Sequence, residues 1–216
     1  MRTTNRARIV GYYGGDNVHA QAAWTSTGTE LHERLDRVPM LLAMLAKGSD
    51  GHPHWTPFER SLLHFNVTVD TATHIHLLKH RTIAANGESA RYKELKADRY
   101  HIPDDWPEAD QQALEAHIIA SYEKYHAMVA QLTPALGRAR AKESARFFLP
   151  YGIQITLDIS MSFRAFVAFI GLRNSPGAQR EIRLLAQQML ELVIHETNGE
   201  FEHSMAAFRL SGSTLT

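Results

Sequence analysis

The sequence predicts a fold that mixes α-helices and β-strands within one domain over residues 1–216. Two segments, Leu63–Val69 and Ile153–Ile159, alternate in character with a period of two, as strands with one buried face do. Elsewhere apolar residues recur every three or four positions, which is the spacing of a helix with one buried face. Neither an internal repeat nor a flexible linker divides the chain, so we expect a single α+β domain with a core over about residues 8–196.

The first half of the chain is read from short periodic runs and from the residues that break them. Residues 8–13 form an expected strand, residues 38–48 an expected helix that stops at its last glycine, and residues 71–78 a short expected helix. Asn86 and Gly87 follow within a stretch of small residues, where we expect a loop.

The second half opens with a strong helix start. Asp105 is placed to cap this helix, Pro107 lies near its first turn, and acidic residues crowd its positive end. The apolar face is expected to consist of Leu114, Ile118, Tyr122, Tyr125 and Val129. A further helix should end near Phe148, residues 163–195 should be helical with a break at the sequence RNSPG, and the tail 211–216 should be frayed.

Composition and charge limit the function. The chain has 23 Lys+Arg and 23 Asp+Glu residues, so its zero net charge predicts no bulk attraction to nucleic acid or to anionic membranes. A site for an anion must therefore be local. The absence of cysteine excludes disulfides, thiolate nucleophiles and zinc–thiolate sites. The first residues contain no signal-peptide core and no run approaches a membrane span, so we expect a cytoplasmic protein.

The 13 histidines suggest a metal site, but their spacing argues against one. His52 and His54 form one H-x-H pair, and His74 and His76 form another. Such a pair shares a face only on a strand, and neither pair has a third ligand at helical spacing. We therefore expect no metal. Fingerprints of dinucleotide-binding folds, P-loops and G-x-S-x-G hydrolases are also missing from the sequence.

The stretch Leu77–Leu95 concentrates unusual chemistry. Residues 79–81 read Lys-His-Arg, Ser89 follows, and Arg91 adds a planar group suited to bidentate phosphate binding. Loop amides near Gly87 complete what looks like an oxyanion cradle. On charge alone, a solvated basic turn between two helices explains the same residues.

The segment KHRTIAANGESARY, residues 79–92, resembles the signature of the flavin-dependent (ThyX-type) thymidylate synthases. That signature reads Arg-His-Arg, seven residues and then Ser, with Asn-Glu inside and Arg-Tyr after. HWTPFER (54–60) is similar to the family's H-E-T-P-F-E segment, and AAWTS near Ser26 to its upstream serine segment. FIGLRNSPGAQREIRLLA (169–186) is similar to its F-L-x-L-R…A-Q-x-E-I run, so the likeness spans roughly residues 20–190.

The resemblance implies a twisted, mostly antiparallel sheet flanked by helices, assembled as a homotetramer whose active sites are shared between subunits. It also implies FAD as cofactor, with NADPH and methylene-tetrahydrofolate as co-substrates. The implied reaction adds a methyl group to C5 of a uracil nucleotide.

Positions that match the family's motifs receive the family's roles. Cofactor-binding positions are Ser26, His54, Thr56, Glu59, Lys79, His80, Arg81 and Asn86. Substrate-binding positions are His76, Gly87, Glu88, Ser89, Ala90, Arg91 and Arg164. Catalytic positions are Ser89, Arg91 and Glu191, the last at the place of a family arginine that meets the uracil ring.

Several positions depart from the family pattern. The substituted positions are Lys79 for arginine, Ala84 for serine, Gly87 for glutamate with Glu88 displaced by one, His76 for glutamine, and Glu191 for arginine, with His195 or Arg183 as replacement cations. A glycine in place of glutamate at position 87 makes room for an extra sugar hydroxyl. We therefore expect UMP as substrate, as in relatives from nucleoside-antibiotic (polyoxin-type) pathways. The alternatives are a dUMP-specific thymidylate synthase and a non-catalytic nucleotide- or metal-binding protein.

Overall fold

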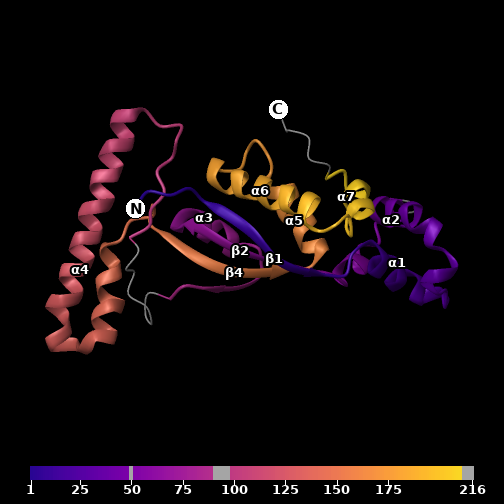
Figure 1. Ribbon diagram of the computed structural model, residues 1–216, viewed down its shortest axis with the longest axis horizontal. Helices are drawn as coiled ribbons and strands as arrows, with labels where there is room; N and C mark the ends of the chain where they lie inside the picture. The colour runs from indigo at the N-terminus through magenta and orange to yellow at the C-terminus, as the bar shows by residue number, and fades with distance from the viewer. Residues whose placement is uncertain (49–50, 90–97, 211–216) are drawn as a thin grey trace. The chain divides into compact units, whose positions relative to one another are not determined.

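The computed structural model describes residues 1–48, 51–89 and 98–210, and Figure 1 shows its elements in chain order. A four-stranded sheet has the order β1 (Arg6–Tyr13), β2 (Leu62–Asp70), β4 (Gln154–Met161), β3 (Ala84–Gly87). The helices are α1 (Asp16–Trp24), α2 (Val38–Lys47), α3 (Thr71–Leu78), α4 (Glu108–Ala145), α5 (Phe163–Arg173), α6 (Arg180–Glu196) and α7 (Glu202–Ala207). Short 3-10 turns are η1 (Thr25–Thr27), η2 (Leu31–Glu33), η3 (Leu35–Arg37), η4 (Thr56–Glu59) and η5 (Arg146–Phe148).

The two predicted period-2 segments are strands β2 and β4, which pair in antiparallel fashion. The Thr68 and Thr156 hydroxyls lie 3.2 Å apart and the His64 ring lies 2.9 Å from Asp158, so partner numbers rise along one strand as they fall along the other. The side chains of Leu63, Phe65, Val67 and Val69 on β2 are fully buried, which confirms the predicted face, whereas Leu62 at the start of the strand is exposed. The mixed fold of helices and an antiparallel sheet is therefore confirmed.

The described chain divides into two compact units, and the prediction of a single domain over 1–216 stays a prediction. The first unit contains residues 1–6, 67–79 and 86–157, and the second contains residues 7–66, 80–85 and 158–216. The predicted frayed tail, 211–216, lies outside the described residues.

In the first unit, α4 consists of two helical limbs that form a hairpin (Figure 1), which confirms the two helices that the sequence predicts. Its limbs meet at Gly137, whose φ of 75° is available to glycine at little cost. The predicted cap at Asp105 is wrong. The N-cap position is Pro107, whose carbonyl oxygen accepts hydrogen bonds from the backbone amides of Asp110 and Gln111. The N-cap position makes no side-chain capping hydrogen bond. None of the helices in the described ranges is both long and apolar enough to cross a membrane.

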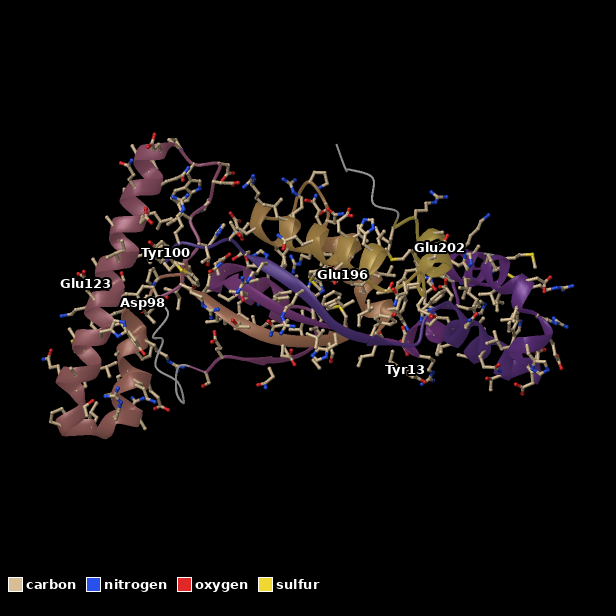
Figure 2. The ribbon with its side chains drawn as sticks, in the orientation of Figure 1. Tyr13, Asp98, Tyr100, Glu123, Glu196 and Glu202 are labelled. Atoms are coloured by element: carbon tan, nitrogen blue, oxygen red, sulfur yellow. The ribbon has the colours of Figure 1, made fainter. Side chains whose placement is uncertain are left out.

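Leu114, Ile118 and Tyr122 of the predicted apolar face of α4 pack on a chain segment that runs beside the helix, whereas Tyr125 and Val129 pack on Ala145 of the second limb. Figure 2 shows Asp98 and Tyr100 on this segment. The core cluster here consists of Tyr100, Ile102, Ile118, Tyr122 and Ile153. The Tyr100 hydroxyl donates to Glu115 (2.7 Å), and Asp98 lies 3.0 Å from the His126 ring. These contacts fix the chain immediately after the segment 90–97, which the structure does not describe.

A buried polar network in the first unit fixes the start of α3. Asp70 caps this helix by accepting from the Thr73 amide at 2.8 Å, and Asn5 bonds to the Asp70 side chain and amide. Gln154 donates to the same Asn5 side chain at 3.0 Å. Because every member is buried, loss of one partner would leave a desolvated polar group in the core.

The second unit is organised around a buried histidine. His19, on α1, lies 2.8 Å from the Ser61 hydroxyl and 2.9 Å from the Ser204 hydroxyl. Its ring packs edge-on against Phe58 and close to Phe163. Helices α1 and α7 escaped the sequence prediction because they bury polar residues at their contact faces, which breaks the apolar periodicity.

We predict that His19 makes the stability depend on pH. Burial lowers the pKa of His19 to about 4, below the ordinary value of 6.5. As the pH falls from 6.5 to about 4, His19 is protonated in the unfolded chain but still neutral in the folded protein. Proton binding therefore favours the unfolded chain, and the free energy of unfolding should drop by about 3 kcal/mol between pH 7 and pH 4. Urea unfolding at several pH values measures the slope.

The control is His19→Gln, which keeps polar contacts but cannot titrate. Burial raises the pKa of Asp16, which contributes with the opposite sign, and this contribution remains in both proteins. The difference between the two slopes therefore isolates His19. Equal slopes in the two proteins would show the prediction to be wrong.

Candidate active site

The motif triplet 79–81 begins where α3 ends. Lys79 is the C-cap of α3 and is exposed, as is Arg81, whereas His80 is half-buried. The His80 Nε2 atom accepts a hydrogen bond from Nε of Arg173 at 2.8 Å, and its ring lies edge-on to Phe169. A neutral His80 in this contact carries its proton on Nδ1. The fixed positive charge beside the motif histidine therefore comes from α5, which sequence reasoning missed.

The segment that contains Asn86 and Gly87 is a strand. The expected loop is wrong, because Ala84–Gly87 forms β3 at the edge of the sheet, and the Glu88 amide donates to the Thr156 carbonyl at 2.8 Å. Gly87 has no left-handed backbone, so it is not a glycine turn. The expected cradle of loop amides is accordingly replaced by an extended strand whose amides serve the sheet.

A cavity of about 650 Å³ in the first unit contains the end of this strand. Its polar lining consists of Thr71, His74, Glu88, Ser89, Arg146 and Tyr151, and the rest of its wall is Gly87, Leu149, Pro150, Ile153 and Ile155. Three of the predicted substrate-binding residues, Gly87, Glu88 and Ser89, thus line this cavity, and Arg146 lines it as well. The sequence offered only a weak signal for Arg146, a basic residue just before Pro150.

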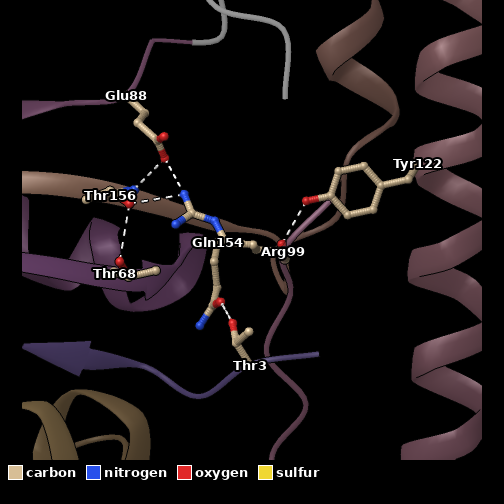
Figure 3. A network of polar contacts seen from close by, with 7 residues as sticks. All are labelled: Thr3, Thr68, Glu88, Arg99, Tyr122, Gln154 and Thr156. Carbon is tan, nitrogen blue, oxygen red and sulfur yellow. Dashed lines mark hydrogen bonds and ion pairs between the residues drawn. The ribbon is translucent and has the colours of Figure 1, made fainter. Parts of the chain in front are cut away.

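Arg146 gives this cavity its positive charge. Burial lowers the pKa of His74, so its imidazole is neutral at neutral pH. The Glu88 carboxylate accepts from Arg99 at 2.6 Å and from the Thr156 amide at 2.8 Å (Figure 3). Since Glu88 is paired, Arg146 can attract an anion into a largely apolar cavity, and the Ser89 hydroxyl can donate to it.

A second cavity, of about 320 Å³, lies in the second unit. Its lining residues are Ala22, Ala23, Ser26, Leu45, His54, Thr56, Pro57 and Arg60. The structure therefore brings together three of the predicted cofactor residues, Ser26, His54 and Thr56, and adds Arg60. Small side chains, two hydroxyls, an imidazole and an arginine fit the oxygen-rich part of a flavin dinucleotide, and the volume suits part of such a molecule.

Glu59 and Arg164 are paired with each other. The Arg164 Nη1 atom lies 2.6 Å from the Glu59 carboxylate, and both side chains are a little under half exposed. A predicted cofactor contact and a predicted phosphate contact thus form one ion pair in the second unit. Neither residue lines the two cavities above.

Glu191 lies on α6 and contacts a histidine. Its carboxylate is 3.1 Å from the ring of His195, one turn further along, in the wall of another cavity of about 430 Å³. A carboxylate cannot supply the positive charge of the family arginine at this position, and the role of Glu191 stays a prediction.

The remaining predicted residues are placed as follows. Asn86 is exposed on β3, His76 is half-buried on α3, and Ala90 and Arg91 lie outside the described residues. Across the described ranges, no group of three or more histidine, aspartate or glutamate side chains is arranged to hold a metal ion.

The sequence has clear relatives. Residues 8–197 match the family described as thymidylate synthase complementing protein (Thy1). The chain is 27% identical to the flavin-dependent thymidylate synthase of Gluconobacter oxydans, over 96% of this chain and 74% of that protein. It is 30% identical to the flavin-dependent thymidylate synthase of Geobacter sulfurreducens, over 81% of this chain and 74% of that one.

Solved structures of similar fold are those of the UMP/dUMP methylase PolB from Streptomyces cacaoi. With 5-Br UMP bound, that protein superposes with a TM-score of 0.77 at 24% identity, covering 98% of this chain and 96% of that chain. With 5-Br dUMP bound, the TM-score is 0.78 at the same identity. At this identity, the likeness establishes the fold.

We predict that Gly87→Ala is tolerated. The added Cβ would lie 3.4 Å from the Leu157 side chain, an ordinary contact, and the extended backbone accepts any residue. The substitution should leave the free energy of unfolding unchanged or raise it by about 0.5 kcal/mol, because alanine restricts the unfolded chain. Urea unfolding gives the value.

Gly15→Ala is the contrasting variant. Gly15 has a φ of 134°, and a Cβ there would collide with the Glu200 carbonyl oxygen. This change should cost on the order of 2 kcal/mol or more. A comparable loss in Gly87→Ala would mean that position 87 is a turn after all.

Proposed function

The chain belongs to the thymidylate synthase complementing protein family and is a methyltransferase, and we propose that it uses FAD to methylate C5 of the uracil base of UMP. It resembles the uridylate methylases of nucleoside-antibiotic pathways, and a UMP/dUMP methylase shares its fold. Methylene-tetrahydrofolate as carbon donor, NADPH as reductant and a homotetramer with shared active sites follow from the family resemblance and stay predictions.

One observation carries the proposal: the cavity of the first unit unites Gly87 and Ser89 of the motif with Arg146. A nucleoside monophosphate needs a cationic and hydroxyl-lined place for its phosphate and an apolar place for its base. We assign the phosphate to Arg146 and Ser89, whose groups all donate hydrogen bonds. Arg91 keeps the phosphate-binding role that the family resemblance implies.

The same cavity supports the choice of a ribonucleotide. Gly87 lines it without a side chain, and we propose that this leaves room for a ribose 2′-hydroxyl beside the strand. His74 is a neutral imidazole with one donor and one acceptor, which matches a hydroxyl that both donates and accepts. Glycine at position 87 and histidine at position 74 together favour UMP over dUMP.

Part of FAD is proposed to bind in the cavity lined by Ser26, His54 and Thr56. The Arg60 guanidinium would neutralise its pyrophosphate, and the two hydroxyls would bond to its oxygens. When bound, FAD supplies the redox chemistry by taking a hydride from NADPH and returning it as the one-carbon unit becomes a methyl group.

Arg173 carries a positive charge of the kind that the proposed reaction requires from the protein. Attack by C5 requires electron density to be drawn toward the uracil carbonyls, and a preorganised cation stabilises that charge. Nε of Arg173 is fixed on His80, which orients the guanidinium plane. Glu191 carries the wrong charge for the role that the resemblance implies, and within the second unit Arg173 is a cation held beside the motif histidine.

Substrate comparison tests the proposed function. Purified protein should be yellow, with flavin absorbance near about 450 nm, and should convert UMP faster than dUMP when given NADPH and methylene-tetrahydrofolate. Gly87→Glu should lower turnover of UMP by about tenfold more than turnover of dUMP, because it fills the space beside the sugar. Gly87→Ala serves as the matched control with little added volume.

Each alternative gives a different result. Strong preference for dUMP by the unchanged protein would favour an ordinary thymidylate synthase. A colourless protein without turnover of either nucleotide would favour a non-catalytic binding protein. Equal losses for both nucleotides in Gly87→Glu would contradict the steric explanation.

Arg146→Ala tests the phosphate site. Loss of a charged donor to the phosphate should weaken UMP binding by about tenfold or more, whereas binding of uridine, which lacks the phosphate, should hardly change. Isothermal titration calorimetry gives both affinities. Arg140→Ala, an arginine on the same unit's α4 outside the cavity, is the control, and equal weakening by the two variants would refute the assignment.

A further inference from the structure

The wall of the cavity proposed for the nucleotide contains a carboxylate. Glu88 lies between Gly87 and Ser89, and all three line the same cavity. A sphere of 650 Å³ is about 11 Å across, so a phosphate bound there lies within the range over which partly buried charges interact strongly. An unpaired Glu88 would therefore repel the substrate.

Arg99 is placed to neutralise this carboxylate. Its Nη2 atom donates to Glu88 Oε2 at 2.6 Å and lies 3.0 Å from the Thr156 hydroxyl (Figure 3). The side chains of Arg99 and Glu88 are 20% and 22% exposed, so water screens the pair only in part. The ion pair is thus stronger than an ordinary surface pair.

The backbone of Arg99 is anchored independently of this ion pair. The carbonyl oxygen of Arg99 accepts hydrogen bonds from the Tyr122 hydroxyl at 2.8 Å and from the backbone amide of Gln154 at 2.9 Å. The Glu88 carboxylate has a second anchor in the Thr156 amide. Removal of the guanidinium would therefore take away the positive charge of Arg99, while the Thr156 amide still holds the Glu88 carboxylate in the cavity wall.

From this geometry we infer that Arg99 is a positioning residue for nucleotide binding, which holds the Glu88 carboxylate against β4 and masks its charge. In this inference Glu88, which the resemblance places among the substrate-binding residues, is one half of a neutral clamp in the cavity wall. This inference rests on the proposed function, since it needs an anionic substrate in the cavity.

The test compares single and double variants of the clamp in the FAD-loaded protein. Arg99→Met should weaken UMP binding by about tenfold, because it unmasks the carboxylate. Glu88→Gln should not weaken it, because it removes the negative charge and leaves Arg99. The double variant Arg99→Met with Glu88→Gln should recover most of the affinity lost in Arg99→Met. Calorimetry with UMP and with uridine separates the effect on the phosphate from that on the rest of the ligand.

A merely structural ion pair predicts another pattern. In that case Glu88→Gln would weaken binding as Arg99→Met does, the double variant would be no better than the single ones, and uridine would be affected as much as UMP. Any of these three results would overturn the inference. The pair Arg140–Glu143 on α4 supplies the control, because its nitrogen–oxygen distance is 3.2 Å and it does not line the cavity. Arg140→Met should leave UMP affinity within about twofold.

Two further results keep the outcomes distinct. Should Arg99→Met fail to fold, Arg99→Lys and Arg99→Gln replace it: lysine should keep near-native UMP affinity and glutamine should lose about as much as methionine, whereas equal affinities would refute the masking. Should the unchanged protein bind neither UMP nor dUMP, the proposed function itself is wrong. A normal UMP affinity in both the unchanged protein and Arg99→Met would refute only the clamp.

Discussion

The pairing of β3 with β4 is the contact on which the site in the first unit depends. The Glu88 amide donates to the Thr156 carbonyl, and the Glu88 carboxylate accepts from the Thr156 amide, each at 2.8 Å. Since side chains alternate along a strand, a shift of one residue would exchange the side chains that face the cavity. This double attachment therefore fixes the register in which Gly87, Glu88 and Ser89 line the cavity.

Although the net charge of the protein is zero, arginines place positive charge at particular points of the structure. Arg146 lines the cavity proposed for the nucleotide, Arg173 contacts His80 from α5, and Arg60 lines the cavity proposed for part of FAD. Each cation belongs to an element adjoining the motif residues that it serves. Two acidic groups are paired with other arginines, Glu88 with Arg99 and Glu59 with Arg164. The negative charges of these two carboxylates are therefore neutralised within their own ion pairs.

The family fold persists at low identity because it is specified by burial rather than by particular side chains. The chain matches solved structures at 24% identity with TM-scores of 0.77 and 0.78. Buried strand faces and the hydrogen-bonded, buried His19 hold the elements together. Residues that depart from the family pattern, such as Lys79 and Gly87, lie at exposed positions. Exposed positions tolerate substitution at small energetic cost, so ligand choice can change while the fold stays.

The sequence alone determined the elements whose signal is local. Hydrophobic periodicity predicted β2, β4 and α2, and the ordered motif identified the family and named Ser26, His54 and Thr56, which line one cavity. Tertiary structure decided the rest. Position 87 is a strand only because Thr156 pairs with its neighbour, and Arg146 and Arg173 gain their roles from residues distant in sequence. Such contacts depend on the path of the whole chain, which no local spacing encodes.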